Sequence, residues 1–259
     1  MRSSFKPALP GTSYPHAVFS RTLSQKCLET DHFTPTSTVR TRFAGEVAEE
    51  VAKANMLALQ NVLPPGDVDA LDEFFKTRDP SLDYLKPWGV IGTLASHLEC
   101  DIETKEGKVV QSNWATLEGV RMTDAQKSIM VRVIDALTRN FHQHIEVLPD
   151  KTYRVVAFLL EYAFKAGQKM TETLDWHQDG YRGQGTLAVF KDPRIHGAQL
   201  EVRSLDETGK VQVQSHESSP GQMLAFNDLE HRVNGVEVDN VDPESPAFRR
   251  IVILGIRQP

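Results

Sequence analysis

The pattern of hydrophobic and polar positions changes near Pro149. Before this residue, apolar side chains recur at helical spacing in several stretches. After it, short β-branched or aromatic runs are bounded by Gly, Pro and Asp. Residues 1–40 are rich in Ser, Thr and Pro and show no clear period. We therefore predict an irregular N-terminal arm over residues 1–40, followed by a single domain over residues 41–259.

The first part of this domain, residues 41–150, carries three helical patterns. Strong helix formers predict a helix over residues 44–61, which Pro64-Pro65-Gly66 would end. A second short helix follows, with one apolar face made by Val68, Leu71, Phe74 and Phe75. Thr123 is placed as the N-cap of a helix that should run to about His144. The predicted buried stripe of that helix is Ile129, Val133, Ile134, Leu137 and Phe141.

The second part, residues 151–259, is predicted as a series of short strands. These cover residues 153–164, 185–190, 199–203, 210–215, 222–226 and 251–256, and two more are expected near 88–94 and 109–115. The fold class is therefore α+β and mainly β. We expect the helices to cover one face of a β-barrel or sandwich.

Composition narrows the function classes. The chain has 259 residues, 25% of them charged, and a formal net charge of −6, so it has no general attraction for nucleic acid phosphates. Its two cysteines are far apart and form no Cys-x-x-Cys pair, which argues against a thiolate zinc site or a disulfide scaffold. Apolar runs fall far short of the roughly 20 residues that a membrane helix needs. We predict a cytoplasmic protein without membrane or nucleic acid partners.

The candidate chemistry begins at His177-Gln178-Asp179. In an extended chain, residues i and i+2 point to the same side, so His177 and Asp179 can bind one ion together. An imidazole and a carboxylate suit ferrous iron, and a second histidine would complete a facial triad with three open positions. Alone, a His-x-Asp pair is common and is more often a surface or hydrogen-bonded pair.

The third ligand is predicted to be His231. It follows a Ser219-Pro220-Gly221 turn signal and a short apolar strand, and it lies 52 residues after Asp179. That separation allows a few antiparallel strands to run out and back. The order of these elements favours a shared site over three unrelated residues.

A basic strand closes the chain. Arg249 opens an apolar run that ends at Arg257, and a guanidinium offers two parallel hydrogen bonds to a carboxylate. We predict that Arg249 holds the far carboxylate of a dicarboxylate cosubstrate. Arg250 would face the other side of the strand, and Arg257 shares the parity of Arg249, so both remain alternatives. A strand end that is merely charged is the third alternative.

Taken together, these motifs resemble the Fe(II)/2-oxoglutarate dioxygenase superfamily, and most closely the bacterial hydroxylases of free amino acids, such as isoleucine dioxygenase. The resemblance rests on His177-Gln178-Asp179-Gly180, the turn at Gly197-Ala198, Asn227-Asp228 before His231, and Phe248-Arg249, and it covers roughly residues 153–257. The chain departs from those hydroxylases where it has Arg250 in place of an acidic residue and Gly197-Ala198 in place of a double glycine.

The resemblance implies a double-stranded β-helix (jelly-roll, cupin-like) core, with covering helices from the N-terminal part. It implies Fe(II) bound by His177, Asp179 and His231, 2-oxoglutarate held by Arg249, and dioxygen as the oxidant. The expected reaction hydroxylates a C–H bond of a small molecule, an amino acid or an amino acid derivative, and releases succinate and CO2.

Further candidate residues lie outside these motifs. Tyr162 and Gln199 are candidates for hydrogen bonds to 2-oxoglutarate, and Trp176, Asn113 and Arg121 for contacts with the substrate. The residues from 44 to 78 offer a face for a possible homodimer. Three alternatives stay open: a non-oxidative cupin-like protein that binds a metal or a small molecule, a nucleic acid dealkylase of the same superfamily, and an interaction module in which the His-x-Asp pair is accidental.

Overall fold

The computed structural model describes residues 40–43, 56–85, 90–106, 108–142, 152–172, 175–205, 208–227, 229–240, 242 and 244–257. All of them belong to one compact unit, His32–Pro259. The predicted arm over residues 1–40 lies outside the described residues, apart from Arg40.

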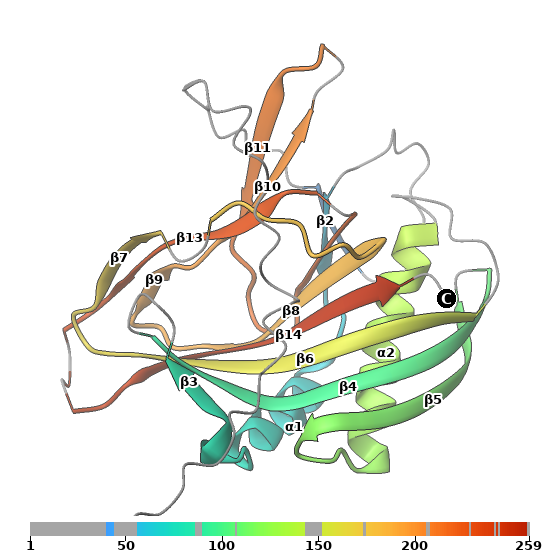
Figure 1. Cartoon of the computed structure of the whole chain (residues 1–259), viewed down its shortest axis with the longest axis horizontal. Helices are drawn as coiled ribbons and strands as arrows, with labels where there is room; N and C mark the ends of the chain where they lie inside the picture. The colour runs from blue at the N-terminus through green and yellow to red at the C-terminus, as the bar shows by residue number, and fades with distance from the viewer. Residues whose placement is uncertain are drawn as a thin grey trace, which may run out of the picture. The chain divides into compact units, whose positions relative to one another are not determined.

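The described part is built from two β-sheets (Figure 1). In spatial order, the nine-stranded sheet contains β1 (Arg40–Phe43), β2 (Met56–Gln60), β12 (Met223–Asn227), β8 (Gly183–Lys191), β14 (Ala247–Arg257), β6 (Thr152–Phe164), β4 (Ile91–Lys105) and β3 (Asp83–Leu85), with β5 (Lys108–Gly119) paired to β4. The five-stranded sheet contains β11 (Val211–His216), β10 (Leu200–Leu205), β13 (His231–Val238) and β7 (Lys169–Glu172), with β9 (Ile195–Gly197) paired to β13. Only β1 and β2 pair in parallel among the described strands. The antiparallel, mainly β architecture is consistent with a jelly roll.

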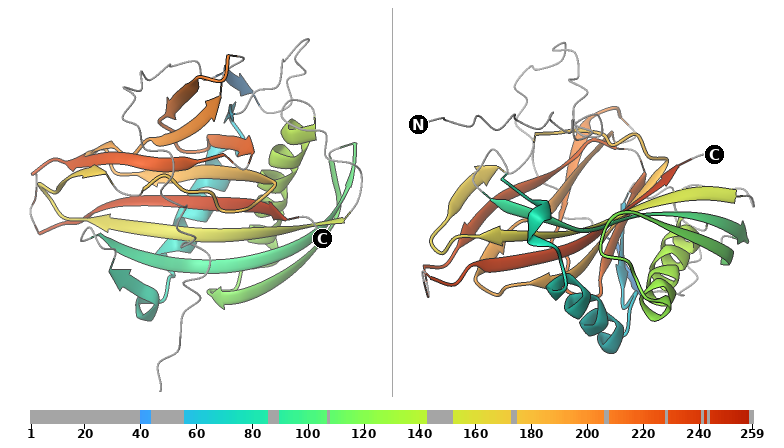
Figure 2. Two further views of the ribbon diagram at one scale, coloured as in Figure 1. Left: turned by 45° about the horizontal axis from the view of Figure 1, so that its top comes forward. Right: turned by 60° about the horizontal axis from the view of Figure 1, so that its bottom comes forward.

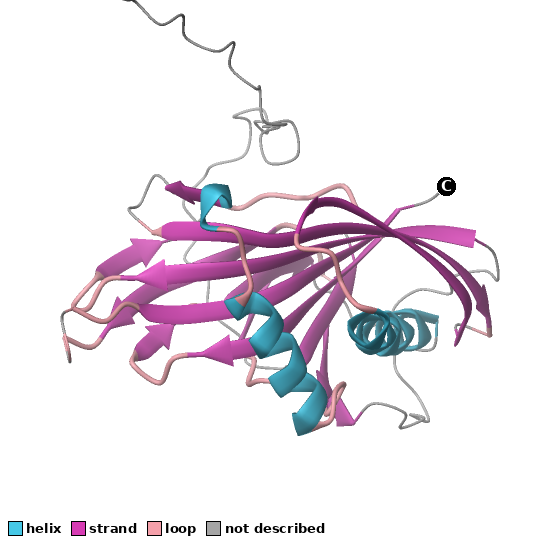
Figure 3. Cartoon of the chain, turned by 90° about the horizontal axis from the view of Figure 1, so that it is seen from below, coloured by secondary structure: helices cyan, strands magenta, loops and turns pink. Residues whose placement is uncertain are grey.

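Two helices, α1 (Pro65–Lys76) and α2 (Asp124–Asn140), lie on one face of the nine-stranded sheet (Figure 3). Thr123 caps α2 through a reciprocal capping box with Gln126, so the predicted N-cap is confirmed. All five residues of the predicted stripe of this helix are buried, at 0–5% exposure. They pack with Leu71, Phe74 and Phe75 of α1 and with the sheet, forming the main core. Neither described helix is long and apolar enough to cross a bilayer.

The first predicted helix is wrong where the structure describes it. Met56–Gln60 form strand β2, which pairs with β12 and with β1, and residues 44–55 lie outside the described residues. Four of the five residues of β2 are at most 2% exposed. Pairing on both edges and burial on both faces outweigh the helix propensity of these residues, which amounts to only a few tenths of a kcal/mol each. The sheet also takes β4 and β5 from residues 41–150, where strands were predicted near 88–94 and 109–115, and both are longer than predicted.

Side chains of strand β14 point alternately to the two faces of the nine-stranded sheet. Val252, Leu254 and Ile256 face the helices and join the main core. Residues of the opposite parity, such as Ala247, lie on the other face, which we call the inner face. There Ala247 and Phe164 of β6 pack against Val236 of β13, so the inner face is the one that meets the five-stranded sheet. Arg249 and Arg257 share the parity of Ala247.

Candidate metal centre

His177 and His231 are paired directly through their backbones. The amide of His177 donates to the carbonyl of His231 at 3.1 Å, and the amide of His231 donates to the carbonyl of His177 at 2.9 Å. This double exchange places the two side chains on the same side, with ring centroids 4.4 Å apart. Strand β13, which begins at His231, was not among the predicted strands, although its first residue was selected as a ligand.

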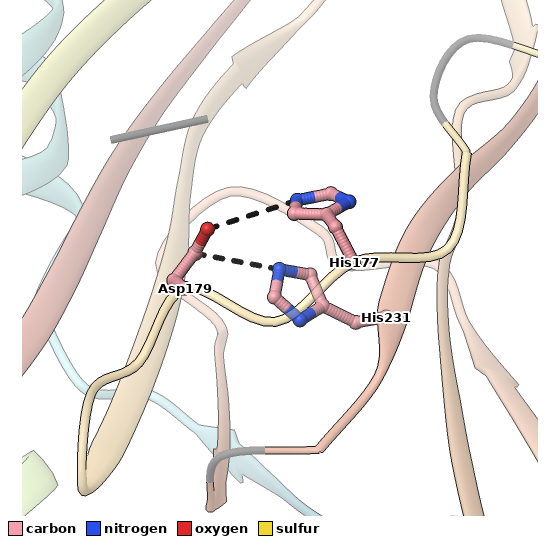
Figure 4. Close-up of side chains that lie close together, drawn as sticks. All are labelled: His177, Asp179 and His231. Atoms are coloured by element: carbon pink, nitrogen blue, oxygen red, sulfur yellow. Dashed lines mark ion pairs between the residues drawn. The ribbon is translucent and has the colours of Figure 1, made fainter. Parts of the chain in front are cut away.

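Asp179 completes a cluster with the two imidazoles (Figure 4). The Nε2 atom of His177 lies 3.8 Å from Oδ1 of Asp179, and Nε2 of His231 lies 3.4 Å from Oδ2. One ligand atom from each residue lies within 4.8 Å of the others. The structure thus brings together the three residues that the sequence selected. Because Asp179 follows His177 by two residues in extended chain, its carboxylate reaches the same side.

Backbone carbonyls set the tautomer of both imidazoles. The Nδ1 of His177 lies 2.8 Å from the carbonyl oxygen of Asp175, and the Nδ1 of His231 lies 3.0 Å from that of Leu229. A carbonyl only accepts hydrogen bonds, so each Nδ1 carries the proton and donates it. Each Nε2 of a neutral ring then presents a lone pair toward Asp179. This outer hydrogen bond is the usual device that orients a metal-binding histidine.

The donor set fits a divalent transition metal ion. Oδ1 of Asp179 is buried and has no hydrogen-bond partner among the described residues. Leaving a buried carboxylate oxygen without a partner is unfavourable unless a cation compensates it. Imidazole–metal bonds of about 2.1 Å place adjacent ligand atoms roughly 3 Å apart, so these side chains need only a small contraction to hold an ion. Two imidazoles and one carboxylate suit iron and leave other coordination positions open.

Comparisons with known proteins agree on the fold. No protein-family model matches the chain, and no curated protein matches it in sequence. Three solved structures are similar in fold. A bsmA homologue from Methylobium petroleophilum PM1 matches with a TM-score of 0.57 and 14% identity, over 79% of this chain and 89% of that one. IDO from Bacillus thuringiensis matches with a TM-score of 0.54 and 10% identity, over 78% of this chain and 89% of that one, and the Fe(II)/α-ketoglutarate-dependent dioxygenase TqaL with a TM-score of 0.50 and 13% identity, over 79% and 83%. The chain shares the fold of such a dioxygenase. At these identities the likeness concerns the fold alone, and it spans most of each chain.

Arg249 lies on the inner face of β14. Its cross-strand neighbours are Tyr162 on β6 and Lys191 on β8. Its guanidinium makes no hydrogen bond or ion pair with any residue that the structure describes. Burial lowers the pKa of Arg249, and the nearby Tyr162 and Glu217 oppose this shift only in part. A desolvated guanidinium without a bonded partner is well suited to an incoming carboxylate.

Arg250 is committed elsewhere, which corrects its assignment as a cosubstrate ligand. Its guanidinium donates to Oε2 of Glu161 at 2.6 Å and to Oδ1 of Asp72 on α1 at 2.7 Å. Arg78 contacts the other oxygen of Glu161 at 2.7 Å. Burial alone would lower the pKa of Arg250, but the hydrogen bonds from Asp72 and Glu161 raise it above its ordinary value. Arg250 therefore fastens α1 to the helix-facing side of the sheet.

Tyr162 and Gln199 both lie in the surroundings of Arg249. Tyr162 is the direct neighbour of Arg249 across β6 and β14. Gln199 hydrogen-bonds Glu217, on which Arg249 also acts electrostatically. The side-chain oxygen of Gln199 accepts hydrogen bonds from Ser215 at 2.8 Å and from Asn234 at 3.2 Å. This anchored position limits its freedom to turn toward a ligand.

Two residues beside Arg249 carried no signal in the sequence. Lys191 donates to the carbonyl of Gly197 at 2.9 Å and also pairs with Glu217. Lys191 ends β8 and Glu217 follows β11, where charged side chains are ordinary. Only the pairing of the strands shows that both lie beside Arg249.

Trp176 does not line the metal centre. Its ring contacts the guanidinium groups of Arg203 and Arg232, whose central carbons lie 4.1 and 4.7 Å from the ring centroid. Arg232 follows His231 on β13 and therefore points to the opposite face of the sheet. The predicted contact of Trp176 with substrate is thus corrected. The ring instead packs outside the five-stranded sheet, directly before the first metal-ligand candidate.

The two remaining substrate candidates lie in different places. Asn113 is exposed and faces Asp101 across β4 and β5, beside a shallow pocket of about 100 Å3 that Arg154 also lines. Arg121 is exposed in the turn before α2, and no contact in the described structure links it to His231 or its neighbours. The structure gives Arg121 no role in the centre.

Proposed function

We propose that the protein is an Fe(II)- and 2-oxoglutarate-dependent dioxygenase that hydroxylates a C–H bond of a small molecule, releasing succinate and CO2. The observation that carries this proposal is the convergence of two imidazoles and a largely buried carboxylate in a mainly antiparallel fold consistent with a jelly roll. The fold shared with TqaL supports it, because that protein is an Fe(II)/α-ketoglutarate-dependent dioxygenase. The motifs of the sequence resemble those of the same superfamily.

The residues of the chain would divide the work as follows. His177, Asp179 and His231 would hold Fe(II), which when bound supplies the activation of dioxygen and the oxidation of the cosubstrate and substrate. Their Nδ1 hydrogen bonds keep both rings fixed before any ligand arrives. Arg249 would bind the far carboxylate of 2-oxoglutarate with a bidentate pair of hydrogen bonds. Its partial burial limits the access of water, which strengthens that contact.

The substrate is proposed to be an amino acid or an amino acid derivative. The resemblance of the sequence motifs to the bacterial hydroxylases of free amino acids supports this finer assignment. A mainly polar inner surface beside the metal centre, described below, agrees with a small polar substrate.

A spectroscopic experiment tests the proposed function. Under anaerobic conditions, Fe(II) and 2-oxoglutarate should give the wild-type protein a weak visible charge-transfer band, which His177→Ala should lack. His196→Ala is the matched control, because this exposed histidine pairs with Asp239 away from the cluster. A wild-type protein without the band, or a His177→Ala variant that keeps it, rejects the proposal. Succinate release across a panel of amino acids, acylated amino acids and small peptides then identifies the substrate.

A further inference from the structure

A polar surface continues from the metal centre along the inner face of β14, β6, β4 and β5. The register aligns Arg257, Arg154, Asp101 and Asn113 in one row across these four strands. A second row, two residues away, contains Gly255, Val156, Glu99 and Ala115. We call this surface the polar shelf and define it by His97, Glu99, Asp101, Glu118, Arg154 and Arg257. Its opposite face packs on α2, around which these strands curve (Figure 2).

Tyr181 connects the polar shelf to the metal centre. It follows Asp179 by two residues, and its ring covers Gly255 so closely that a Cβ atom at Gly255 would lie 2.6 Å from the ring. Only 3% of Tyr181 is exposed. Its hydroxyl lies within hydrogen-bonding reach of Arg257, and Asp179 and Glu99 act on it electrostatically. The shelf therefore begins directly beside the ligand cluster. Glycine at position 255 is what allows the ring to lie flat on the sheet.

Two polar groups meet at this junction, the hydroxyl of Tyr181 and the guanidinium of Arg257. The hydroxyl oxygen of Tyr181 is buried, and among the described residues only Arg257 lies near it as a hydrogen-bonding group. The guanidinium of Arg257 lies 5.3 Å from the Tyr181 ring centroid and forms no ion pair with any described residue. By contrast, the neighbouring Arg154 binds Asp101 with two contacts, at 2.8 and 3.3 Å. Arg257 is thus the shelf arginine that retains its capacity to bind an anion.

Acidic groups lie on the other side of this junction. Burial lowers the pKa of His97, which stacks on Phe158 at 4.4 Å and faces both Glu99 and Glu118. Glu99 is 24% exposed, and its nearest cation is Arg154, at 3.7 Å. A carboxylate this loosely paired, beside a neutral imidazole, can accept hydrogen bonds from an ammonium group. Cation and anion sites therefore flank Tyr181.

We propose that Arg257 and the Tyr181 hydroxyl bind the carboxylate of the substrate and that Glu99 binds its ammonium group. This assignment rests on the proposed function and deepens it, because it selects a zwitterionic substrate and names its recognition residues. The guanidinium and the phenol, which lie beside each other, would both donate hydrogen bonds to the same carboxylate. Arg249 and Arg257, eight residues apart on one face of β14, would then serve the cosubstrate and the substrate separately.

Calorimetric titration of the anaerobic protein, loaded with Fe(II) and 2-oxoglutarate, tests the assignment. The probes are the common L-amino acids, their amides, which lack the carboxylate charge, and the corresponding deaminated acids. At least one amino acid should bind the wild-type protein, and its amide should bind roughly 10- to 100-fold more weakly. Arg257→Ala should weaken binding of the acid by a similar factor and leave binding of the amide unchanged.

Three further variants sharpen the result. Tyr181→Phe should weaken the acid several-fold without affecting the amide, and Glu99→Gln should weaken the amino acid but not its deaminated analogue. Arg132→Ala, on the exposed side of α2, is the matched control and should change nothing. The charge-transfer band should persist in all four variants.

Distinct outcomes separate the two proposals. If the wild-type protein shows no charge-transfer band, the proposed function fails and this assignment falls with it. If the band forms but no amino acid binds, or if Arg257→Ala weakens acid and amide equally, only the substrate assignment is overturned. An increased requirement for 2-oxoglutarate in Arg257→Ala would also overturn it, since Arg257 would then belong to the cosubstrate.

Discussion

Arg249 and Arg250 are adjacent in sequence, and their guanidinium groups lie on opposite faces of the nine-stranded sheet. Arg250 is bonded to two carboxylates on the helix side, whereas Arg249 has no bonded partner among the described residues. The same side-chain chemistry therefore has two roles, one structural and one available for a ligand. Substitution of each arginine should separate these roles.

Arg249→Ala is expected to raise the 2-oxoglutarate concentration needed for turnover roughly 10- to 100-fold, because a charge-assisted bidentate contact is lost. Metal affinity and the unfolding midpoint should change little, since the guanidinium makes no bonded contact in the protein. Succinate formation against 2-oxoglutarate concentration measures the effect. Unchanged dependence on 2-oxoglutarate would assign the cosubstrate carboxylate to another residue.

Arg250→Ala is expected to lower the free energy of unfolding by about 3 kcal/mol, because it leaves Glu161 with less compensation at 2% exposure. Urea unfolding followed by far-UV circular dichroism measures this loss. Arg132→Ala, which removes a half-exposed ion pair with Asp67, should cost less than about 1 kcal/mol. Equal losses for the two variants would contradict a special role of the buried network.

Asp179→Ala is expected to leave the metal-free protein as stable as the wild type or more stable, because Oδ1 of Asp179 is buried without a hydrogen bond. Mn(II) should raise the melting temperature of the wild type, since a ligand that binds only the folded state stabilises it. The variant should show no such rise. Differential scanning fluorimetry with and without Mn(II) makes the comparison, and a metal-induced rise in Asp179→Ala would count against the cluster as a metal site.

Trp176→Ala is expected to weaken Mn(II) binding roughly tenfold without removing a ligand, because supporting residues of a metal site commonly contribute at this level. The ring contacts Arg203 and Arg232 and so fixes the chain just before His177. Trp176→Phe should keep part of the contact and lie between the two. Calorimetric titration of Mn(II) provides the affinities, and wild-type affinity in both variants would leave Trp176 a purely surface role.

The parts of the site that were predictable from sequence follow local rules. His177 and Asp179 share a side because extended chain alternates, and Thr123 begins α2 because its side chain can satisfy a free amide. Arg249 and Arg250 could be assigned to opposite faces by the same alternation. None of these conclusions needed the identity of a neighbouring strand.

The parts that were missed depend on pairing between distant segments. Met56–Gln60 have helical propensity, and only their position between β1 and β12 makes them a strand. Trp176 was predicted to contact the substrate. Its observed partners, Arg203 and Arg232, come from two later strands that the sequence does not place beside it. Tyr181 and Arg257 gained importance only when the structure placed the phenol over Gly255. A single sequence records such long-range neighbours weakly.

The alternation of side chains along β14 places two arginines on its inner face at a fixed separation. Eight residues of extended chain separate Arg249 from Arg257, so the two Cα atoms lie roughly 26 Å apart on one face of the strand. Inserting a single residue between Arg249 and Ile251, while the hydrophobic half of β14 kept its pairing, would turn Arg249 away from the inner face and leave Arg257 in place. Deleting Ile256 would turn Arg257 away from the inner face and leave Arg249 in place. The length of this strand, and not only its composition, is therefore under constraint.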